Sequence, residues 1–298
     1  MKFDEFIARI LEALKIRLLE NGEEVVLRTN KVLKNNGVEL TALNVCRDAD
    51  EVSPTIYLEP FYRAYMNGMS YEDVLDDIYR LQLMRSFENA LSIDAVVNEE
   101  HVLDNIIIRL INRKRNEKML EDIPYIEVKD LVIVFRRVVR LDSDGVATTL
   151  VNRQDMNRWR LTVDSLYKKA LDNTERMFPV VKESIFETLR SRFDNYEICN
   201  TDMDDELFIL TNEMGINGAT AMMYSGMLDE CADMAGGDIY ILPSSVHEIL
   251  FTRVTLERNE NDLKELIKEA NRDAVSELDF LSDNLYLYKK ADKELCIV

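Results

Sequence analysis

Four residues near the C-terminal end of the chain are of types that could do chemistry together. The stretch DIYILPSSVHEILF, residues 238–251, carries Ser244, Ser245, His247 and Glu248 within five positions. Nucleophilic catalysis by serine needs its hydroxyl within hydrogen-bond reach of a base, and that base must be oriented by an acid. The stretch therefore supplies the residue types of a hydrolytic site, and the question is whether their spacing allows one.

The spacing argues against a self-contained catalytic set. If a strand runs from Ser244 to Leu250, alternation places Ser245 and His247 on one face and Glu248 on the other, so Glu248 cannot orient His247. If a serine instead caps a short helix, His247 lies in its first turn, where free backbone amides can receive an anion. The nucleophile elbow Gly-x-Ser-x-Gly is absent from the chain.

We therefore predict a structural turn that ends a strand at Pro243, in which a serine satisfies nearby backbone donors. Contact of Ser244, Ser245, His247 and Glu248 with a ligand or peptide is the first alternative, and a hydrolase is the second. The hydrolase requires a pocket at the turn and another acid within about 3.5 Å of the His247 ring. We assign no catalytic residue from the sequence.

Metal and cofactor motifs are missing. A His-Glu-x-x-His site would need a histidine at Phe251, and the only other histidine is His101. The pair Asp76-Asp77 indicates a solvated helix face, and the run NTDMDDE at 200–206 lacks the glycine and the terminal glutamate of a calcium loop. The cysteines, at 46, 199, 231 and 296, are scattered, which favours free thiols. Phosphate-binding glycine motifs are absent as well, so we expect no metal and no cofactor.

Aromatic residues recur at near-helical spacing between positions 57 and 65. Tyr57, Phe61, Tyr62 and Tyr65 are most simply read as part of the core. Tyrosine is also a favoured anchor of protein interfaces, so the same residues are a candidate interaction surface.

Charge bears on possible partners. The net charge of −19 opposes binding to nucleic acid and to anionic membranes. Residues 109–169 are an exception, because they hold 14 basic and 9 acidic residues. We interpret them as a solvated helix face whose positive charge balances the acidic remainder of the chain across a contact between lobes. A phosphate- or RNA-binding patch is the alternative.

The elements that would position these residues indicate an α+β fold, with helices packed on antiparallel sheet built from hairpins. Helices are expected at 2–20, 55–68, 70–90, 99–122, 152–171, 179–193, 225–237 and 260–277, and hairpins around 35–37, 143–145, 217–218 and 290–292. Pro124 is the expected boundary between a mainly helical lobe at 1–124 and an α+β lobe at 125–298, although one continuous domain is also compatible with the pattern.

Several phrases resemble one known family. They are KNNGVELTALNV, VSPTIYLEPFYRAYMNGMSYEDVL, LTNEMGINGATAMMY, GGDIYILPSSVHEILF and EANRDAVSELDFLSDNLYLY, which occur in this order from about residue 30 to the C-terminus. Together they are similar to the bacterial (Firmicutes) domain-of-unknown-function family numbered 5688. The resemblance implies a bacterial, soluble protein and supplies no activity, cofactor or site residue.

We predict a cytoplasmic binding or interaction protein, with an unknown protein as a possible partner and no membrane association. No apolar run approaches the roughly 18–20 residues needed to span a bilayer. The alternatives are a hydrolase that uses Ser244 or Ser245 with His247, and a nucleic-acid mimic or binder.

Overall fold

The computed structural model describes residues 1–46, 55–89, 99–142, 145–185 and 207–298. Its backbone contacts divide the chain into two compact units. Unit 1 comprises Met1–Lys34 and Val38–Glu99, and unit 2 comprises Asn35–Gly37 and Glu100–Val298. The three residues Asn35–Gly37 thus belong to unit 2 although their neighbours in sequence belong to unit 1. The lobe boundary at Pro124 stays a prediction.

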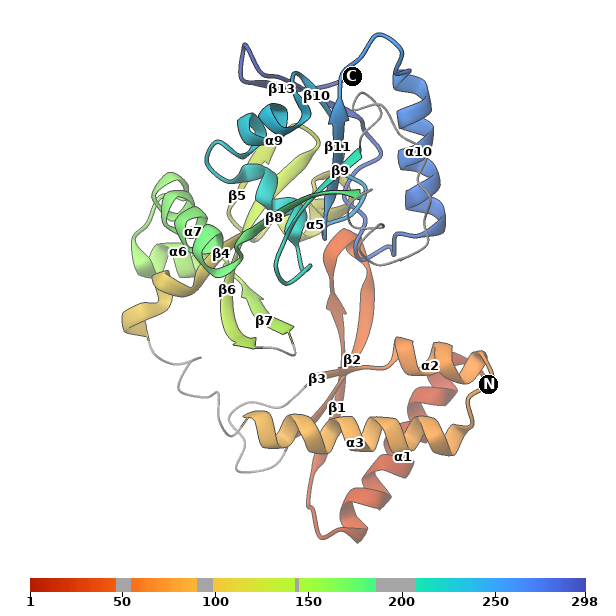
Figure 1. Ribbon diagram of the computed structural model, residues 1–298. Helices are drawn as coiled ribbons and strands as arrows, with labels where there is room; N and C mark the ends of the chain where they lie inside the picture. The colour runs from red at the N-terminus through yellow and green to blue at the C-terminus, as the bar shows by residue number, and fades with distance from the viewer. Residues whose placement is uncertain (47–54, 90–98, 143–144, 186–206) are drawn as a thin grey trace. The chain divides into compact units, whose positions relative to one another are not determined.

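Unit 1 packs helices on a three-stranded antiparallel sheet of order β1-β2-β3 (Figure 1). Its elements are α1 (Phe3–Glu20), β1 (Val26–Leu33), β2 (Glu39–Cys46), β3 (Thr55–Tyr57), α2 (Glu59–Met66) and α3 (Tyr71–Asn89). Phe6, Ile10, Leu14 and Leu18 recur every four residues and form the buried stripe of α1. The stripe packs against a core to which β2, β3 and α3 also contribute.

The start of α3 follows the sequence prediction. Ser70 Oγ accepts a hydrogen bond from the backbone N–H of Asp73 at 3.1 Å and donates to the Asp73 carboxylate at 2.7 Å. This arrangement satisfies one of the free amides of the first turn, as an N-terminal cap does.

Unit 2 contains two antiparallel sheets around a shared core. The first has four strands: β4 (Ile106–Asn112), β5 (Tyr125–Val128), β6 (Leu131–Asp142) and β7 (Gly145–Leu150). The second has the order β13-β12-β10-β11-β9-β8, with β8 (Val180–Ser184), β9 (Leu207–Asn212), β10 (Ile239–Leu242), β11 (Ile249–Arg253), β12 (Tyr286–Lys289) and β13 (Glu294–Ile297).

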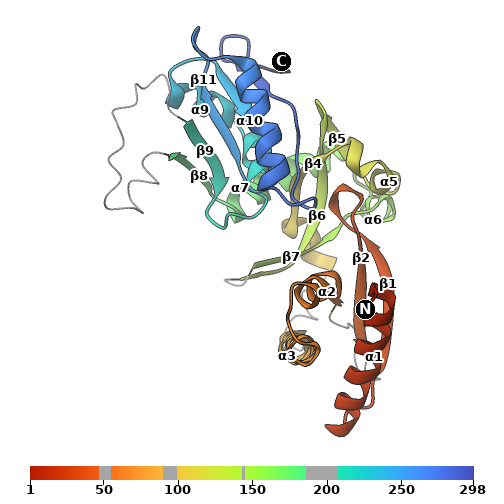
Figure 2. The ribbon, with the colours of Figure 1, turned by 90° about the vertical axis from the view of Figure 1, so that its right-hand side faces the viewer.

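Alternation along the strands decides which side of each sheet faces this core. In the second sheet, Ile239 and Ile241 of β10 join the shared core, whereas Tyr240 and Leu242 face a smaller cluster with Leu263 and Ile267 of helix α10. The α10 helix, Glu260–Asp273, therefore lies on the outer face of this sheet (Figure 2).

The remaining elements of unit 2 are helices of 3 to 15 residues. They are η2 (Glu99–Asn105), η3 (Lys114–Asn116), α5 (Glu117–Leu120), α6 (Arg153–Trp159), α7 (Val163–Met177), η5 (Gly218–Met223) and α9 (Met227–Ala235). Residues of α7, η5 and α9 contribute to the shared core, so these helices pack against the two sheets. Together with unit 1, this arrangement confirms the predicted α+β class.

Four local predictions are wrong. The helix expected at 55–68 begins as strand β3, and helix α2 starts only at Glu59. Residues 99–122 are not one helix, because the β-branched run Ile106–Ile108 forms strand β4 with both faces buried. The start of the expected 179–193 helix is strand β8; residues 186–193 lie outside the described residues. The hairpin expected at 217–218 does not form, since strand β9 is followed by the 3-10 helix η5.

Other boundaries are adjusted rather than overturned. The helix expected at 152–171 is two helices, α6 and α7, and each begins with a capping box, at Asn152 and at Thr162. The turn expected at 143–145 joins β6 and β7, although residues 143 and 144 lie outside the described residues. The hairpins at 35–37 and 290–292 are confirmed by the pairing of β1 with β2 and of β12 with β13.

Candidate functional site

The stretch Ser244–Glu248 forms the connection between β10 and β11, which pair antiparallel with Leu242 opposite Leu250. Neither a continuous strand nor a capped helix forms there. The backbone of this connection lies beside residues 279–282, as shown by hydrogen bonds from Val246 N to Asp279 O at 2.8 Å and from Leu281 N to Ser244 O at 3.0 Å. We call residues 243–248 the His247 loop.

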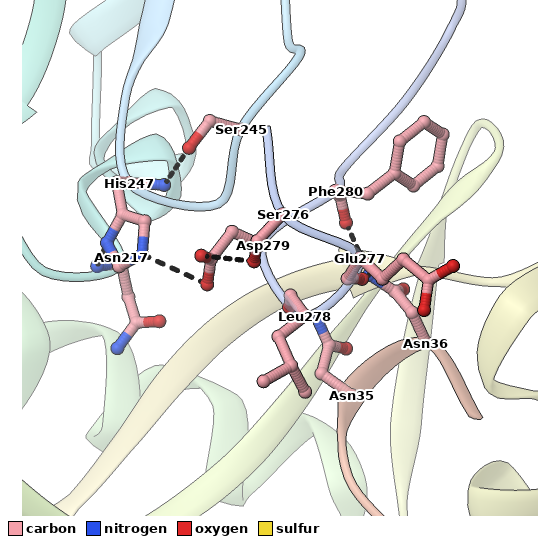
Figure 3. A network of polar contacts seen from close by, with 10 residues as sticks. All are labelled: Asn35, Asn36, Asn217, Ser245, His247, Ser276, Glu277, Leu278, Asp279 and Phe280. Carbon is pink, nitrogen blue, oxygen red and sulfur yellow. Dashed lines mark hydrogen bonds and ion pairs between the residues drawn. The ribbon is translucent and has the colours of Figure 1, made fainter. Parts of the chain in front are cut away.

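The imidazole of His247 is held on both of its nitrogens. Its Nε2 lies 3.2 Å from Asp279 Oδ1, and its Nδ1 accepts a 3.4 Å hydrogen bond from the backbone N–H of Asn217 (Figure 3). Asp279 in turn accepts a 2.7 Å hydrogen bond from the hydroxyl of Ser276. The hydrogen bond between the two side chains raises the pKa of His247 and lowers the pKa of Asp279.

The serines of the His247 loop do not contact the imidazole. Ser245 is buried, and its Oγ accepts a 3.0 Å hydrogen bond from the backbone N–H of His247, which is a local turn contact. Figure 3 shows the Ser245 hydroxyl on the backbone of His247 and the ring pointing toward Asp279. Among the described residues, no hydrogen bond joins the side chain of Ser244 to a partner.

Asp279 is the acid that the sequence did not name, and its position reverses the order of a catalytic triad. In a triad the histidine lies between the serine and the acid. Here the acid lies between Ser276 and His247, so no base faces a serine hydroxyl. A signal was present in the sequence, because SELD at 276–279 has the Ser-x-x-Asp pattern of a local hydrogen-bonded turn, but nothing local pairs it with His247.

Close packing of Gly218 and Thr211 against the carbonyl oxygen of His247 fixes the His247 loop. A Cβ on Gly218 would lie 2.1 Å from Thr211 Oγ1 and 2.4 Å from the carbonyl oxygen of His247. Thr211 Oγ1 also donates a 2.8 Å hydrogen bond to this same carbonyl. Position 218 therefore has room for glycine alone, and this close approach holds the backbone of His247 in place.

Two charged residues near the His247–Asp279 pair change the pKa of His247 in opposite directions. Glu248 raises the pKa of His247 through its charge, and Arg109 of β4 lowers it. Burial lowers the pKa of Arg109 itself to about 10. Its Nε is buried and has no hydrogen-bond partner among the described residues. The direct contact with Asp279 outweighs these effects, so the pKa of His247 is raised overall.

Residues Asn35–Gly37 hold the segment that carries Asp279. Asn36 Nδ2 donates 2.8 Å hydrogen bonds to the carbonyl oxygens of Glu277 and Phe280, and Asn35 Nδ2 donates at 2.7 Å to that of Leu278. Asn36 adopts the left-handed backbone conformation, with φ of 60°, which asparagine tolerates better than most residues. The backbone of residues 277–280 is therefore fixed by side chains distant in sequence, as Figure 3 shows for Asn35 and Asn36.

A cavity of about 400 Å³ lies beside the same segment, within the size range of small-molecule sites. We call it the α10 cavity. Its lining comes from η3, from the C-terminal half of α10 and from residues 275–283, namely Arg115, Lys268, Asn271, Arg272, Val275, Ser276, Glu277, Phe280 and Asp283. The guanidinium carbon of Arg115 lies 3.5 Å from the centroid of the Phe280 ring, a cation–π contact.

The charged groups of the α10 cavity differ in how they are paired. Lys268 lies 2.7 Å from Glu265 and Arg272 lies 2.7 Å from Asp273. In the described parts of the chain, neither Arg115 nor Glu277 has an ion pair. Asp283 also lacks an ion pair but accepts a hydrogen bond from Asn271, so among the described residues Arg115 is the cation and Glu277 the carboxylate of the cavity with neither an ion pair nor a side-chain hydrogen bond.

The aromatic residues predicted as a possible interaction surface lie in unit 1. Phe61, Tyr62 and Tyr65 pack against the core of this unit, and the ring centroids of Phe6 and Tyr62 are 5.3 Å apart. The ring of Tyr57 lies 4.2 Å below the ammonium of Lys34. All four side chains are partly exposed, so their use as an interaction surface stays a prediction.

The acidic and basic stretches fall in different surroundings. Asp76 forms an ion pair with Arg17 of α1, which lowers the pKa of Asp76, whereas residues 202–205 lie outside the described residues. The basic stretch, expected as one helix face, is spread over strands β4 and β6, short helices and the helices α6 and α7, and within it Arg113 pairs with Glu127 at 2.9 Å. Basic and acidic side chains are intermingled there, which argues against a continuous phosphate-binding groove.

No group of three or more potential ligands that could hold a metal ion occurs in the described part of the chain. No helix within the described residues has both the length and the apolar character required to cross a membrane.

Fold and site thus define an α+β protein with a cavity beside the segment that carries Asp279. The model of the Family of unknown function (DUF5688) matches residues 3–290, and the chain therefore belongs to this family. The resemblance stated from the sequence phrases is confirmed at the level of the family. No curated protein and no solved structure matches the chain.

Proposed function

We propose that the protein is a non-catalytic binding protein of the cytoplasm that holds a small charged ligand in the α10 cavity. The observation that carries this proposal is the pairing of an open volume of about 400 Å³ with an unpaired cation and an unpaired carboxylate. Side chains that recognise ligands are normally few and placed on a fixed framework. The hydrogen bonds from Asn35 and Asn36 supply that framework for residues 277–280.

The His247 loop has a supporting role in this proposal. Both imidazole nitrogens of His247 and the Ser245 hydroxyl have partners within the protein, and Asp279 is the link by which the loop positions the segment that lines the cavity. Ser244, Ser245, His247 and Glu248 then act on the ligand through Asp279 and its neighbours rather than by touching it.

A hydrolase remains the alternative because one of its two requirements is met: an acid lies within reach of the His247 ring. The other requirement, a pocket at the turn, has no support from the α10 cavity, because none of residues 243–248 lines it. The alternative predicts that Ser244→Ala or Ser245→Ala abolishes hydrolysis of a simple ester such as p-nitrophenyl acetate. We expect both variants to match the wild-type protein in that assay.

The cytoplasmic location is supported by cysteine chemistry. Cys46, Cys231 and Cys296 are free thiols, as is usual in a reducing compartment. A protein partner contacting Tyr57, Phe61, Tyr62 and Tyr65 is compatible with this location and belongs to the same class of function. The net charge of −19 makes nucleic acid an unfavourable partner, because both would be negatively charged.

A cavity-filling variant tests the proposal. Val275→Trp places a large side chain at a lining position, and Leu256→Trp places the same side chain at a fully exposed position outside the cavity. We expect saturation-transfer NMR with a library of small charged molecules to give signals with the wild type and L256W that are lost with V275W. Signals that persist in V275W would contradict the proposal, and so would a library without binders.

A further inference from the structure

The charges of the α10 cavity are not equivalent, and the difference indicates what kind of ligand fits. Lys268 and Arg272 each have a carboxylate neighbour on the same helix, Glu265 and Asp273. These pairs are largely neutral as units and add little net charge to the cavity. Asp283 is engaged by Asn271, whose Nδ2 donates to its carboxylate at 2.8 Å.

Arg115 is prepared to bind a carboxylate. Its guanidinium lies over the Phe280 ring, so one face is covered by an aromatic surface and the planar group is held in orientation. The N–H donors at the edge of the guanidinium have no carboxylate partner among the described residues. A guanidinium in this state binds a carboxylate through two parallel hydrogen bonds, with less ordering cost than a free side chain.

Glu277 supplies the opposite charge. Its backbone carbonyl is fixed by Asn36, and the carbonyls of Leu278 and Phe280 are fixed by Asn35 and Asn36. Its carboxylate has no ion pair within the described ranges. An ammonium group is the complementary partner of a carboxylate with free acceptor oxygens.

We infer that the α10 cavity binds a small zwitterion, a free amino acid or a short peptide, whose carboxylate contacts Arg115 and whose ammonium contacts Glu277. The volume of about 400 Å³ accommodates a ligand of this size, and Val275 is the partly exposed apolar residue of its lining. This inference rests on the proposed function and assigns its substrate class.

Three related probes test the contributions of the ligand's ammonium and carboxylate groups independently. Glycylglycine carries both, N-acetylglycylglycine lacks the ammonium, and glycylglycinamide lacks the carboxylate. We expect NMR titration of the wild-type protein to show glycylglycine binding about ten-fold more tightly than either capped probe, since each charge-assisted contact contributes about that factor.

Two variants assign the contacts. Arg115→Gln is expected to remove the preference for glycylglycine over glycylglycinamide, and Glu277→Gln to remove the preference over N-acetylglycylglycine. Lys114→Gln and Glu257→Gln are matched controls, because both residues are charged, exposed and outside the cavity lining. We expect the controls to bind all three probes as the wild type does.

The outcomes distinguish this inference from the proposed function. If the capped probes bind as tightly as glycylglycine and V275W abolishes all binding, the cavity is a binding site but the zwitterion assignment is wrong. If no titration shows binding of glycylglycine, the assignment is wrong as well. If V275W binds every probe like the wild type, the proposed function itself fails.

Discussion

The His247 loop and the α10 cavity are built on the same segment, residues 276–283, but they treat polar groups in opposite ways. In the His247 loop, both imidazole nitrogens, the Ser245 hydroxyl and four backbone carbonyls, those of Pro243, Ser244, Val246 and His247, have partners within the protein. In the α10 cavity, Arg115 and Glu277 lack ion pairs among the described residues. Polar groups that already have partners hold a structure, and charged groups that lack them are available to a ligand.

The comparison shows that residue types typical of catalysis can serve structure, whereas charged residues outside any catalytic motif can be available to a ligand. Ser, His and Glu close together in sequence suggest chemistry, yet here they form a connection between two strands. The residues that remain available come from η3 and from the segment after α10, and no catalytic motif marks them. Variants on the two sides of the segment should therefore have different consequences: loss of stability at the His247 loop, and loss of binding at the cavity.

The largest effect is expected behind the His247 loop. Gly218→Ala would place a Cβ 2.4 Å from the carbonyl oxygen of His247, so the backbone must shift. We expect a loss of about 3 kcal/mol in the free energy of unfolding, measured by urea denaturation, as for other overpacked sites. Gly237→Ala is the control, because its Cβ would meet only the Arg253 side chain, at 3.6 Å. Equal stability of the two variants would refute the close-packing argument.

A smaller effect is expected at the Asn36 turn. Asn36→Gly keeps the left-handed backbone but removes the hydrogen bonds to Glu277 and Phe280. We expect a loss of about 1–2 kcal/mol in the free energy of unfolding, together with weaker binding of glycylglycine. Lys129→Gly is the matched control, since Lys129 has φ of 58° in an exposed turn, and this change should be neutral or slightly stabilising. An N36G protein as stable as the wild type would mean that the turn does not hold residues 277–280.

The smallest effect concerns the His247–Asp279 pair. Both side chains are about a third exposed, 34% and 38%, so solvent screening limits the contribution to below about 1 kcal/mol. Because the pKa of His247 is raised, its contribution is fully present below the unfolded pKa of about 6.5 and is lost as pH rises through the folded value. Because the pKa of Asp279 is lowered, its contribution is present above about 3.8 and is lost as pH falls through the folded value.

Asp279→Asn tests this window. We expect the pKa of His247, followed by NMR titration of its ring proton, to fall in D279N toward its ordinary range. The stability difference between the two proteins should be largest between about pH 4 and 6.5. Since the chain has two histidines, a His101→Gln variant assigns the signals. A His247 titration that is unchanged by D279N would exclude the ion pair.

The sequence predicts much of the fold where a local signal is strong. The Asn35–Gly37 turn, the stripe of α1, the Ser70 cap and the closing hairpin all follow from local turn or periodicity rules. Strand β4 was mistaken for a helix because an apolar run that is buried on both faces has no alternation to reveal it. The strand–helix sequence after β9 was missed because Asn217-Gly218 is a hairpin signal that here begins a 3-10 helix packed under the His247 loop.

The candidate site was less predictable because its members are far apart in sequence. Asp279 lies 32 positions after His247, and their approach depends on how the segment before β12 pairs with the β10–β11 connection. Arg115 follows β4 of the other sheet, so its approach to Phe280 depends on contacts between the two sheets. The prediction that His247 and Glu248 diverge assumed a strand from Ser244 to Leu250, and this strand does not form. The pairing state of a surface charge, which distinguishes Arg115 from Arg113, has no signature in the local sequence.

One titration tests the central claim, that the α10 cavity contacts the ligand and the His247 loop supports it. Glycylglycine is added to the wild-type protein while the Arg115 Nε–H signal and the His247 ring signal are followed by NMR in the same sample. We predict that the Arg115 signal shifts to saturation and that the His247 signal stays in place. A saturable shift of His247 with an unmoved Arg115 signal would contradict the account and would place the ligand at the His247 loop.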